Sequence, residues 1–158
     1  MTASVPHRTY DVLGQLMRFH AFPDEVSGKY CLVETVVPPG LGAPPNHHAG
    51  ETEAFYVLDG EVEFMVAGET RRVGAGGFMA IPDGALHAFS AVGERPARML
   101  ILNAPGEMHA EFFTRIGREL PDDTAAPVPP EGPPDLAAIG AAAAAVGMTL
   151  VVPEGAPG

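Results

Sequence analysis

The sequence predicts an all-β protein, a jelly-roll barrel with helices at its C-terminal end. Short runs of alternating apolar and polar residues fill the first two thirds of the chain, and this period is typical of β-strands. Glycine, proline and aspartate separate the runs, which gives roughly eight to ten strands at the spacing of a small barrel. After Pro105-Gly106 the apolar residues recur at helical spacing instead.

The expected strands are runs of β-forming residues between turn signals. They cover residues 16–21, 30–37, 54–58, 61–67, 70–73, 78–81, 86–91 and 97–102. Asp59-Gly60 is a strong hairpin signal, so we expect it to join 54–58 directly to 61–67. Gly68-Glu69 is the next expected turn. No internal repeat is visible, which indicates a single barrel unit.

The C-terminal third divides into a helix, a connector and a second helix. One apolar stripe defines the first helix, with Met108, Phe112, Ile116 and Leu120 four residues apart. We expect this helix to pack on the outside of the barrel. Residues 121–134 contain six prolines and are expected to form an extended connector. The second helix should begin after Asp135, its N-terminal cap, and end near Gly147, with an edge strand over 149–152.

These boundaries predict three parts of the chain. Residues 1–120 form the barrel with its first helix, 121–134 the connector, and 135–158 the second helix and the tail. The second helix carries only a thin apolar stripe, so we expect it to dock on the barrel or on a partner.

The composition excludes several classes of protein. At 158 residues the chain is long enough for one domain with a real core. Twenty acidic residues against nine basic ones give a net charge of −11, which would repel nucleic acid and anionic lipids. Cys31 has no partner for an internal disulfide, and no apolar run reaches the ~20 residues that span a bilayer. We therefore expect a cytoplasmic protein that binds neither nucleic acid nor membranes.

Two polar segments near the middle of the chain contain the candidate site. Residues two apart share one face of a strand, so Asn46 and His48 should point the same way and His47 the opposite way. Glu53 lies in an apolar run, where a buried carboxylate must pair or bind a metal. The imidazoles of His48 and His87 with the Glu53 carboxylate would leave coordination positions open, as in catalytic metal sites.

Asn46 and His47 are the alternatives for a further ligand. An amide oxygen is a poorer ligand for transition metals than imidazole, so Asn46 could instead hydrogen-bond a substrate. His47 is the less favoured substitute, because the strand period turns it to the other face. Three further histidines lie outside both segments and are assigned no role: His7, His20 and His109.

The two segments resemble the paired motifs of the cupin superfamily, G-x5-H-x-H-x4-E-x6-G and G-x5-P-x-G-x2-H-x3-N. The matching positions are Gly40, His48, Glu53, Gly60, Gly76, Pro82, Gly84 and His87. Asn46 and Ala91 depart from the motifs, at the first histidine and at the closing asparagine. Residues 27–105 are similar to small single-domain bacterial cupins of the quercetin-dioxygenase-like kind.

This resemblance implies a jelly-roll barrel that binds one divalent metal, either Fe, Ni, Mn, Zn or Co, and no organic cofactor. The implied ligands are His48, Glu53 and His87, with Asn46 completing or adjoining the shell. The superfamily includes dioxygenases, isomerases, epimerases, decarboxylases and cyclases, as well as binding domains without chemistry. The fold alone therefore does not select a function.

Three functions stay open at this point. The first is a metal-assisted enzyme that cyclises, isomerises or dioxygenates a small aromatic or carbonyl-containing metabolite, with the three metal ligands as its catalytic residues. The second is a metal-free acid–base enzyme, in which burial raises the pKa of Glu53. The third is a non-catalytic protein that binds a small molecule. For each, we expect Phe55, Phe89 and Met99 to line an apolar substrate pocket.

We also expect a homodimer. A barrel of short strands leaves open sheet edges, and pairing about a two-fold axis is the commonest way to cover them. Residues 10–21 are the expected contributors, because they alternate like a strand but are expected to lie outside the barrel that carries the motifs.

Overall fold

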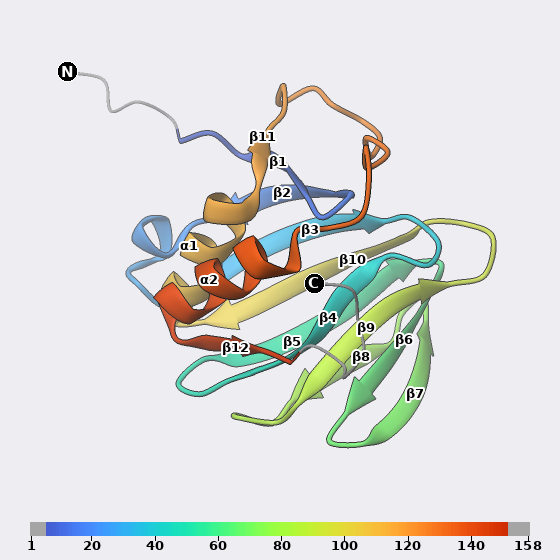
Figure 1. The fold of residues 1–158 in the computed structure, drawn as a ribbon, viewed down its shortest axis with the longest axis horizontal. Helices are drawn as coiled ribbons and strands as arrows, with labels where there is room; N and C mark the ends of the chain where they lie inside the picture. Colours follow the sequence, from blue (N-terminus) through green and yellow to red (C-terminus); the bar gives the residue numbers. More distant parts are fainter. Residues whose placement is uncertain (1–5, 152–158) are drawn as a thin grey trace.

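The structure is a computed structural model, and it describes residues 6–151. Two antiparallel sheets make up the barrel, and the two helices lie together beside the larger sheet (Figure 1). The larger sheet has the order β11 (Arg118–Glu119), β1 (Thr9–Val12), β2 (Gln15–Ala21), β3 (Cys31–Val37), β10 (Ala97–Ala104), β5 (Thr52–Asp59) and β8 (Phe78–Ile81). The smaller sheet has the order β12 (Met148–Leu150), β4 (Gly42–His48), β9 (His87–Val92), β6 (Glu61–Val66) and β7 (Glu69–Gly74). The predicted fold class, a jelly roll with C-terminal helices, is confirmed.

The core lies between the two sheets and consists of the inward side chains of alternating strands. On β5, Phe55 and Val57 are fully buried, as the strand period predicts. Phe55 contacts Phe64 of β6 and Phe89 of β9, with ring centroids 5.0 and 5.5 Å apart. This aromatic cluster joins the two sheets, and Phe55 and Phe89 line the same cavity as Glu53.

The predicted hairpin at Asp59-Gly60 is wrong. β5 pairs with β10 and β8, whereas β6 pairs with β7 and β9, so the turn carries the chain from one sheet to the other. Gly60 has a φ of 78°, and a Cβ there would lie only 2.8 Å from the Pro96 oxygen. The close approach of another strand therefore requires glycine at this position. The true hairpin joins β6 to β7 through Ala67-Gly68, one residue earlier than expected.

The N-terminal strands belong to the chain's own barrel. β1 and β2 form a hairpin, and β2 continues the larger sheet beside β3. Met17 and Phe19 are buried in the common core. The expectation that residues 10–21 lie outside the barrel is therefore wrong, because their apolar face completes the core rather than remaining available to a partner.

The C-terminal region begins with α1 (Glu107–Ile116) and continues through β11. The helix ends before Gly117, so Leu120, which we expected on its stripe, lies beyond it. Its buried side chains include Phe112 and Phe113, which line the cavity between the sheets. The expectation that this helix packs on the outside is wrong. It closes the open end of the barrel instead, because two of its rings complete the apolar interior there.

Residues 121–135 form neither helix nor strand, and α2 (Leu136–Val146) follows them. The Asp135 side chain accepts a hydrogen bond from the Ala138 N–H, which confirms the predicted cap. The helix buries Ile139 and Ala143. β12 then pairs with β4, so an edge strand does follow α2, while residue 152 lies outside the described residues. No helix within residues 6–151 is long and apolar enough to cross a bilayer.

Candidate metal centre

Three strands bring the predicted ligands together. His48 is the last residue of β4, Glu53 lies on β5, and His87 is the first residue of β9. All three are buried. One ligand atom from each lies within 4.8 Å of the others. The ladders on both sides of these strands fix the three side chains relative to one another, so the arrangement is preorganised for a metal ion.

Glu53 is the centre of this cluster. Its Oε1 atom lies 3.1 Å from His87 Nε2, and its Oε2 atom lies 2.7 Å from Nε2 of His109, a residue of α1. Asn103 on the neighbouring β10 donates its amide N–H to Oε2 at 2.5 Å. His48 Nε2 is farther away, 3.9 Å from Oε2. The carboxylate therefore has two imidazoles in close contact and a third nearby.

The imidazoles of His87 and His109 both point Nε2 toward the Glu53 carboxylate, and in both rings Nδ1 has another partner. His87 donates Nδ1–H to the Ala85 carbonyl oxygen at 2.8 Å. His109 uses Nδ1 toward Glu51 Oε1 at 2.6 Å. In a neutral imidazole only one nitrogen carries a proton, so each Nε2 would present a lone pair to Glu53. Each contact with Glu53 therefore requires a proton or a metal ion between the two atoms.

His48 differs from the other two histidines, because neither of its ring nitrogens has a hydrogen-bond partner within the described residues. Burial lowers the pKa of His48 to about 4, and the nearby charge of His109 adds to the shift. The ring is therefore neutral near pH 7 and has a lone pair to give. A buried imidazole without a hydrogen-bond partner is rare in proteins, and the ability to bind an ion is one of its ordinary explanations.

His109 and Glu51 belong to the site, although the sequence analysis gave His109 no role and did not consider Glu51. Glu51 accepts hydrogen bonds from the first backbone N–H groups of α1, including Gly106 at 2.7 Å and Met108 at 3.0 Å. Burial would lower the pKa of His109, but Glu53 and Glu51 outweigh it and raise that pKa to about 9. Without a metal, His109 is thus a buried imidazolium between two carboxylates.

The hypothesis of a raised pKa for Glu53 is wrong. Burial alone would raise it, as we expected, but the charge of His109 and the hydrogen bonds from His109 and His87 more than compensate. The pKa of Glu53 therefore lies well below its usual range. A carboxylate that stays ionised is suited to binding a cation and is a weak general base.

The two alternative ligands on β4 differ in their surroundings. Asn46 lines the cavity, and its amide N–H groups point to backbone oxygens of Pro44, at 2.9 Å, and His87, at 3.4 Å. His47 is half-buried and lies opposite Thr149 of β12. Asn46 is therefore the one of the two that shares the cavity with Glu53.

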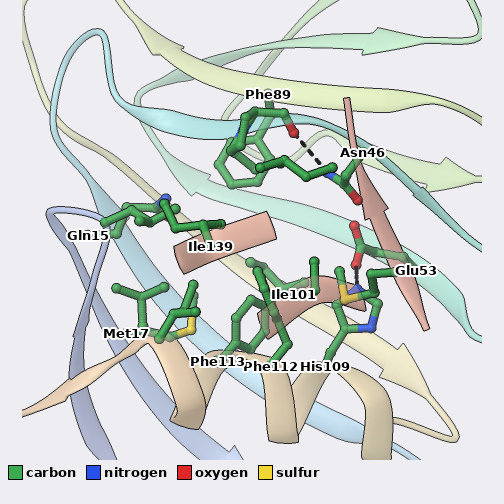
Figure 2. A pocket seen from close by; sticks show the side chains of 18 of the residues that line it. Gln15, Met17, Asn46, Glu53, Phe89, Ile101, His109, Phe112, Phe113 and Ile139 are labelled. Carbon is green, nitrogen blue, oxygen red and sulfur yellow. Dashed lines mark hydrogen bonds and ion pairs between the residues drawn. The ribbon is translucent and has the colours of Figure 1, made fainter. Parts of the chain in front are cut away.

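An apolar cavity of about 60 Å³ adjoins the cluster. Figure 2 shows Glu53 and His109 on one side of it, with Asn46 and Phe89 above and the α1 rings below. Phe55 and Phe89 line it, as expected. Met99 does not. It is fully buried on β10, between its strand partners Thr35 of β3 and Val57 of β5. Helix α2 supplies further wall residues, Ile139 and Ala143.

Comparison with known proteins agrees with this architecture. The model of the cupin domain matches residues 33–103, so this part of the chain is similar to the cupin domain in sequence as well as in fold. Over 103 residues it is 25% identical to quercetin 2,3-dioxygenase of Bacillus subtilis. That alignment covers 65% of this chain and 30% of the dioxygenase. The chain thus spans about a third of the length of this relative.

Solved structures show the same fold at low identity. A predicted oxalate decarboxylase of Thermotoga maritima matches with a TM-score of 0.58 and 20% identity, over 66% of this chain and 98% of its own. KdgF from Halomonas sp. matches with a TM-score of 0.52 and 24% identity, over 58% and 79% of the two chains. These likenesses support the barrel fold and cover about two thirds of this chain or less.

Proposed function

We propose that this chain is an enzyme that uses one divalent metal ion to act on a small, largely apolar molecule. His48, Glu53 and His87 hold the metal. The observation that supports this best is the arrangement of hydrogen-bonding atoms around Glu53. An ionised carboxylate faces the His87 nitrogen whose partner nitrogen already donates elsewhere, while His48 has no hydrogen-bond partner among the described residues. One cation would take the place of the proton that the contact between Glu53 and His87 needs, and would also give one His48 nitrogen a partner.

The cavity supports a small substrate. Its volume of about 60 Å³ is well below the roughly 150 Å³ that accommodates benzene in an engineered apolar cavity. A second, open groove of about 730 Å³ shares Pro44, Phe89 and Ile139 with it and runs along the proline-rich segment. A carbonyl or enol group would enter the inner cavity toward the metal, and the rest of the molecule would lie in the groove.

The residues present fit the chemistry of a metal-assisted reaction. A bound ion would polarise a carbonyl or enol oxygen as a Lewis acid. The apolar walls exclude water from that oxygen, and Asn46 offers the substrate a polar contact inside the cavity. Cyclisation, isomerisation and dioxygenation of a small aromatic or carbonyl-containing metabolite are all compatible. The likeness to quercetin 2,3-dioxygenase supports dioxygenation among these.

Elemental analysis tests this proposal. Protein purified without chelators or a chelating tag should carry close to one Fe, Ni, Mn, Zn or Co per chain, and His87→Ala should carry almost none. His20→Ala is the matched control, because His20 pairs with Glu34 on the exposed face of the larger sheet. Metal content below about a tenth of an equivalent, with no uptake on adding these metals, would contradict the proposal.

A measurement of oxygen uptake then separates the reaction classes. If the chain is a dioxygenase, the metal-loaded protein should consume dioxygen with a flavonol such as quercetin, and His87→Ala should not. Metal-loaded protein that consumes no dioxygen with aromatic enols would exclude the dioxygenase and leave cyclisation or isomerisation.

We further propose that the protein is a homodimer. β8 and β7 are the outer strands of the two sheets on the side away from the C-terminal region, and an open edge is commonly covered by pairing. Light scattering at micromolar concentration should give about twice the chain mass of 16.4 kDa. A monomer at tens of micromolar would refute the dimer.

A further inference from the structure

One histidine of the cluster comes from outside the barrel. His109 is the third residue of α1 and is buried. Its ring centroid lies 4.5 Å from that of His48, and its Nε2 atom lies 2.7 Å from Glu53 Oε2. The C-terminal region therefore places an imidazole against two of the three metal ligands.

Glu51 holds His109 in the orientation of a metal ligand. Its Oε1 atom lies 2.6 Å from His109 Nδ1, and its own position is fixed by the backbone N–H groups of Gly106, the N-cap of α1, and of Met108. A side chain at position 106 could not replace this glycine, since a Cβ there would lie 2.4 Å from the Cys31 nitrogen. Histidines that bind metals almost always donate their second nitrogen to a carboxylate or carbonyl in this way.

The distances around Glu53 suit one coordination shell. The carboxylate oxygens lie 2.7, 3.1 and 3.9 Å from the Nε2 atoms of His109, His87 and His48. Ligand atoms about 2.0–2.2 Å from one ion are roughly 3 Å apart when adjacent and at most about 4 Å apart when opposite. The Nε2 atom of His109 thus lies at least as close to the Glu53 carboxylate as that of His87, although among the described residues the group whose ligand atoms all lie within 4.8 Å of one another is His48, Glu53 and His87.

We infer that His109 is a fourth protein ligand of the metal, so that helix α1 supplies the third imidazole in place of the histidine that Asn46 replaces. This inference rests on the proposed metal site. Asn46 itself is tied to the wall of the cavity by its amide contacts with backbone oxygens. A purely structural ion pair of His109 with Glu53 would leave both nitrogens of His48 without a hydrogen-bond partner among the described residues. A shared ion would bind one nitrogen of each ring.

Counting imidazoles on a bound metal tests this inference. Cu²⁺ added to the metal-free protein should show three coordinated imidazole nitrogens by pulsed electron paramagnetic resonance, and His109→Ala should show two. Titration with Co²⁺, followed by its visible absorption, should show at least about tenfold weaker binding by His109→Ala. His20→Ala should keep three imidazoles and native affinity. His109→Gln, which retains a polar side chain of similar reach, serves as a second variant in case His109→Ala does not fold.

The possible outcomes separate this inference from the proposed function. Two imidazoles in both the native protein and His109→Ala, with equal Co²⁺ affinity, would overturn the inference and leave the three-residue site intact. No binding of either metal by the native protein would overturn both. A count that falls from three to two, with circular dichroism unchanged, would establish His109 as a ligand, because a structural role moves stability but not the number of coordinated nitrogens.

Discussion

The barrel strands and the C-terminal region build the same site by different means. His48, Glu53 and His87 lie on strands that pair on both sides, and the ladders hold them in place. His109 lies on a ten-residue helix, and its ring is oriented mainly by Glu51. Helix α2 buries only Ile139 and Ala143 among its eleven residues. The barrel is thus fixed by many backbone hydrogen bonds, and the C-terminal region by few side chains.

This difference indicates where the general and the particular parts of the site lie. The motif residues of the barrel are those shared with the cupin superfamily. The C-terminal region supplies the additional imidazole and one wall of the cavity, through residues that no family motif contains. The residues that match the family motifs therefore lie on the barrel strands, and the residues particular to this chain lie on the segment that borders the cavity.

The largest expected difference between the two regions is in the free energy of unfolding that a core substitution costs. Phe64→Ala in the barrel should lower the free energy of unfolding by about 3–5 kcal/mol, because the ring is fully buried between the sheets. Ile139→Ala in α2 should cost about 2 kcal/mol, since its side chain already borders a cavity. Urea denaturation in the presence of a chelator measures both. Equal losses would show that α2 is as much a part of the core as β6 is.

Much of the fold was predictable because it depends on local sequence. The positions of β2, β3 and β5 to β10 follow from alternation, and the cap at Asp135 follows from a side chain that bonds three residues along the chain. The strands β1 and β4 were not among the predicted runs. The turn at Asp59-Gly60 was mispredicted for a physical reason. A tight turn fixes a change of direction, whereas the sheet in which the next strand pairs depends on contacts with β9 and β7.

The site divides in the same way. The spacing of the motifs predicted His48, Glu53 and His87, because strand geometry converts spacing into a shared face. It could not predict His109, whose contact with Glu51 joins residues 58 positions apart. The expectation for the pKa of Glu53 failed for the same reason, because the charge that overcomes burial comes from α1. Histidine in the first turn of a helix that follows the second motif is the signal that could have found it.

The next largest effect is expected at Glu51, which connects the barrel to α1. Glu51→Gln should weaken metal binding by about 10–100-fold, because it removes the charge that orients His109 while keeping the shape of the side chain. Competition with a calibrated chelator gives the dissociation constant. Glu61→Gln is the matched control, since that carboxylate lies exposed near Arg72 on the smaller sheet. Equal affinities for the two variants would show that His109 needs no such support.

A double variant tests whether a histidine at position 46 of the barrel can replace His109 of α1 as a metal ligand. In the His109→Ala background, Asn46→His should restore metal affinity by about tenfold, roughly 1.4 kcal/mol, because position 46 lines the cavity beside Glu53. The count of coordinated imidazoles should return to three. If Asn46→His helps neither the affinity nor the count, the two positions do not serve the same place in the coordination shell.

The smallest expected effect is at His47, and it checks the register of β4. His48 is buried in the cluster, and the adjacent His47 lies opposite Thr149, where β4 meets the C-terminal strand β12. Successive side chains of a strand point to opposite faces, so His47→Ala should change metal affinity less than about twofold and stability by about 0.5 kcal/mol or less. Chelator competition and urea denaturation measure the two quantities. A loss of metal in His47→Ala, together with native affinity in His109→Ala, would mean that the third imidazole comes from the barrel after all.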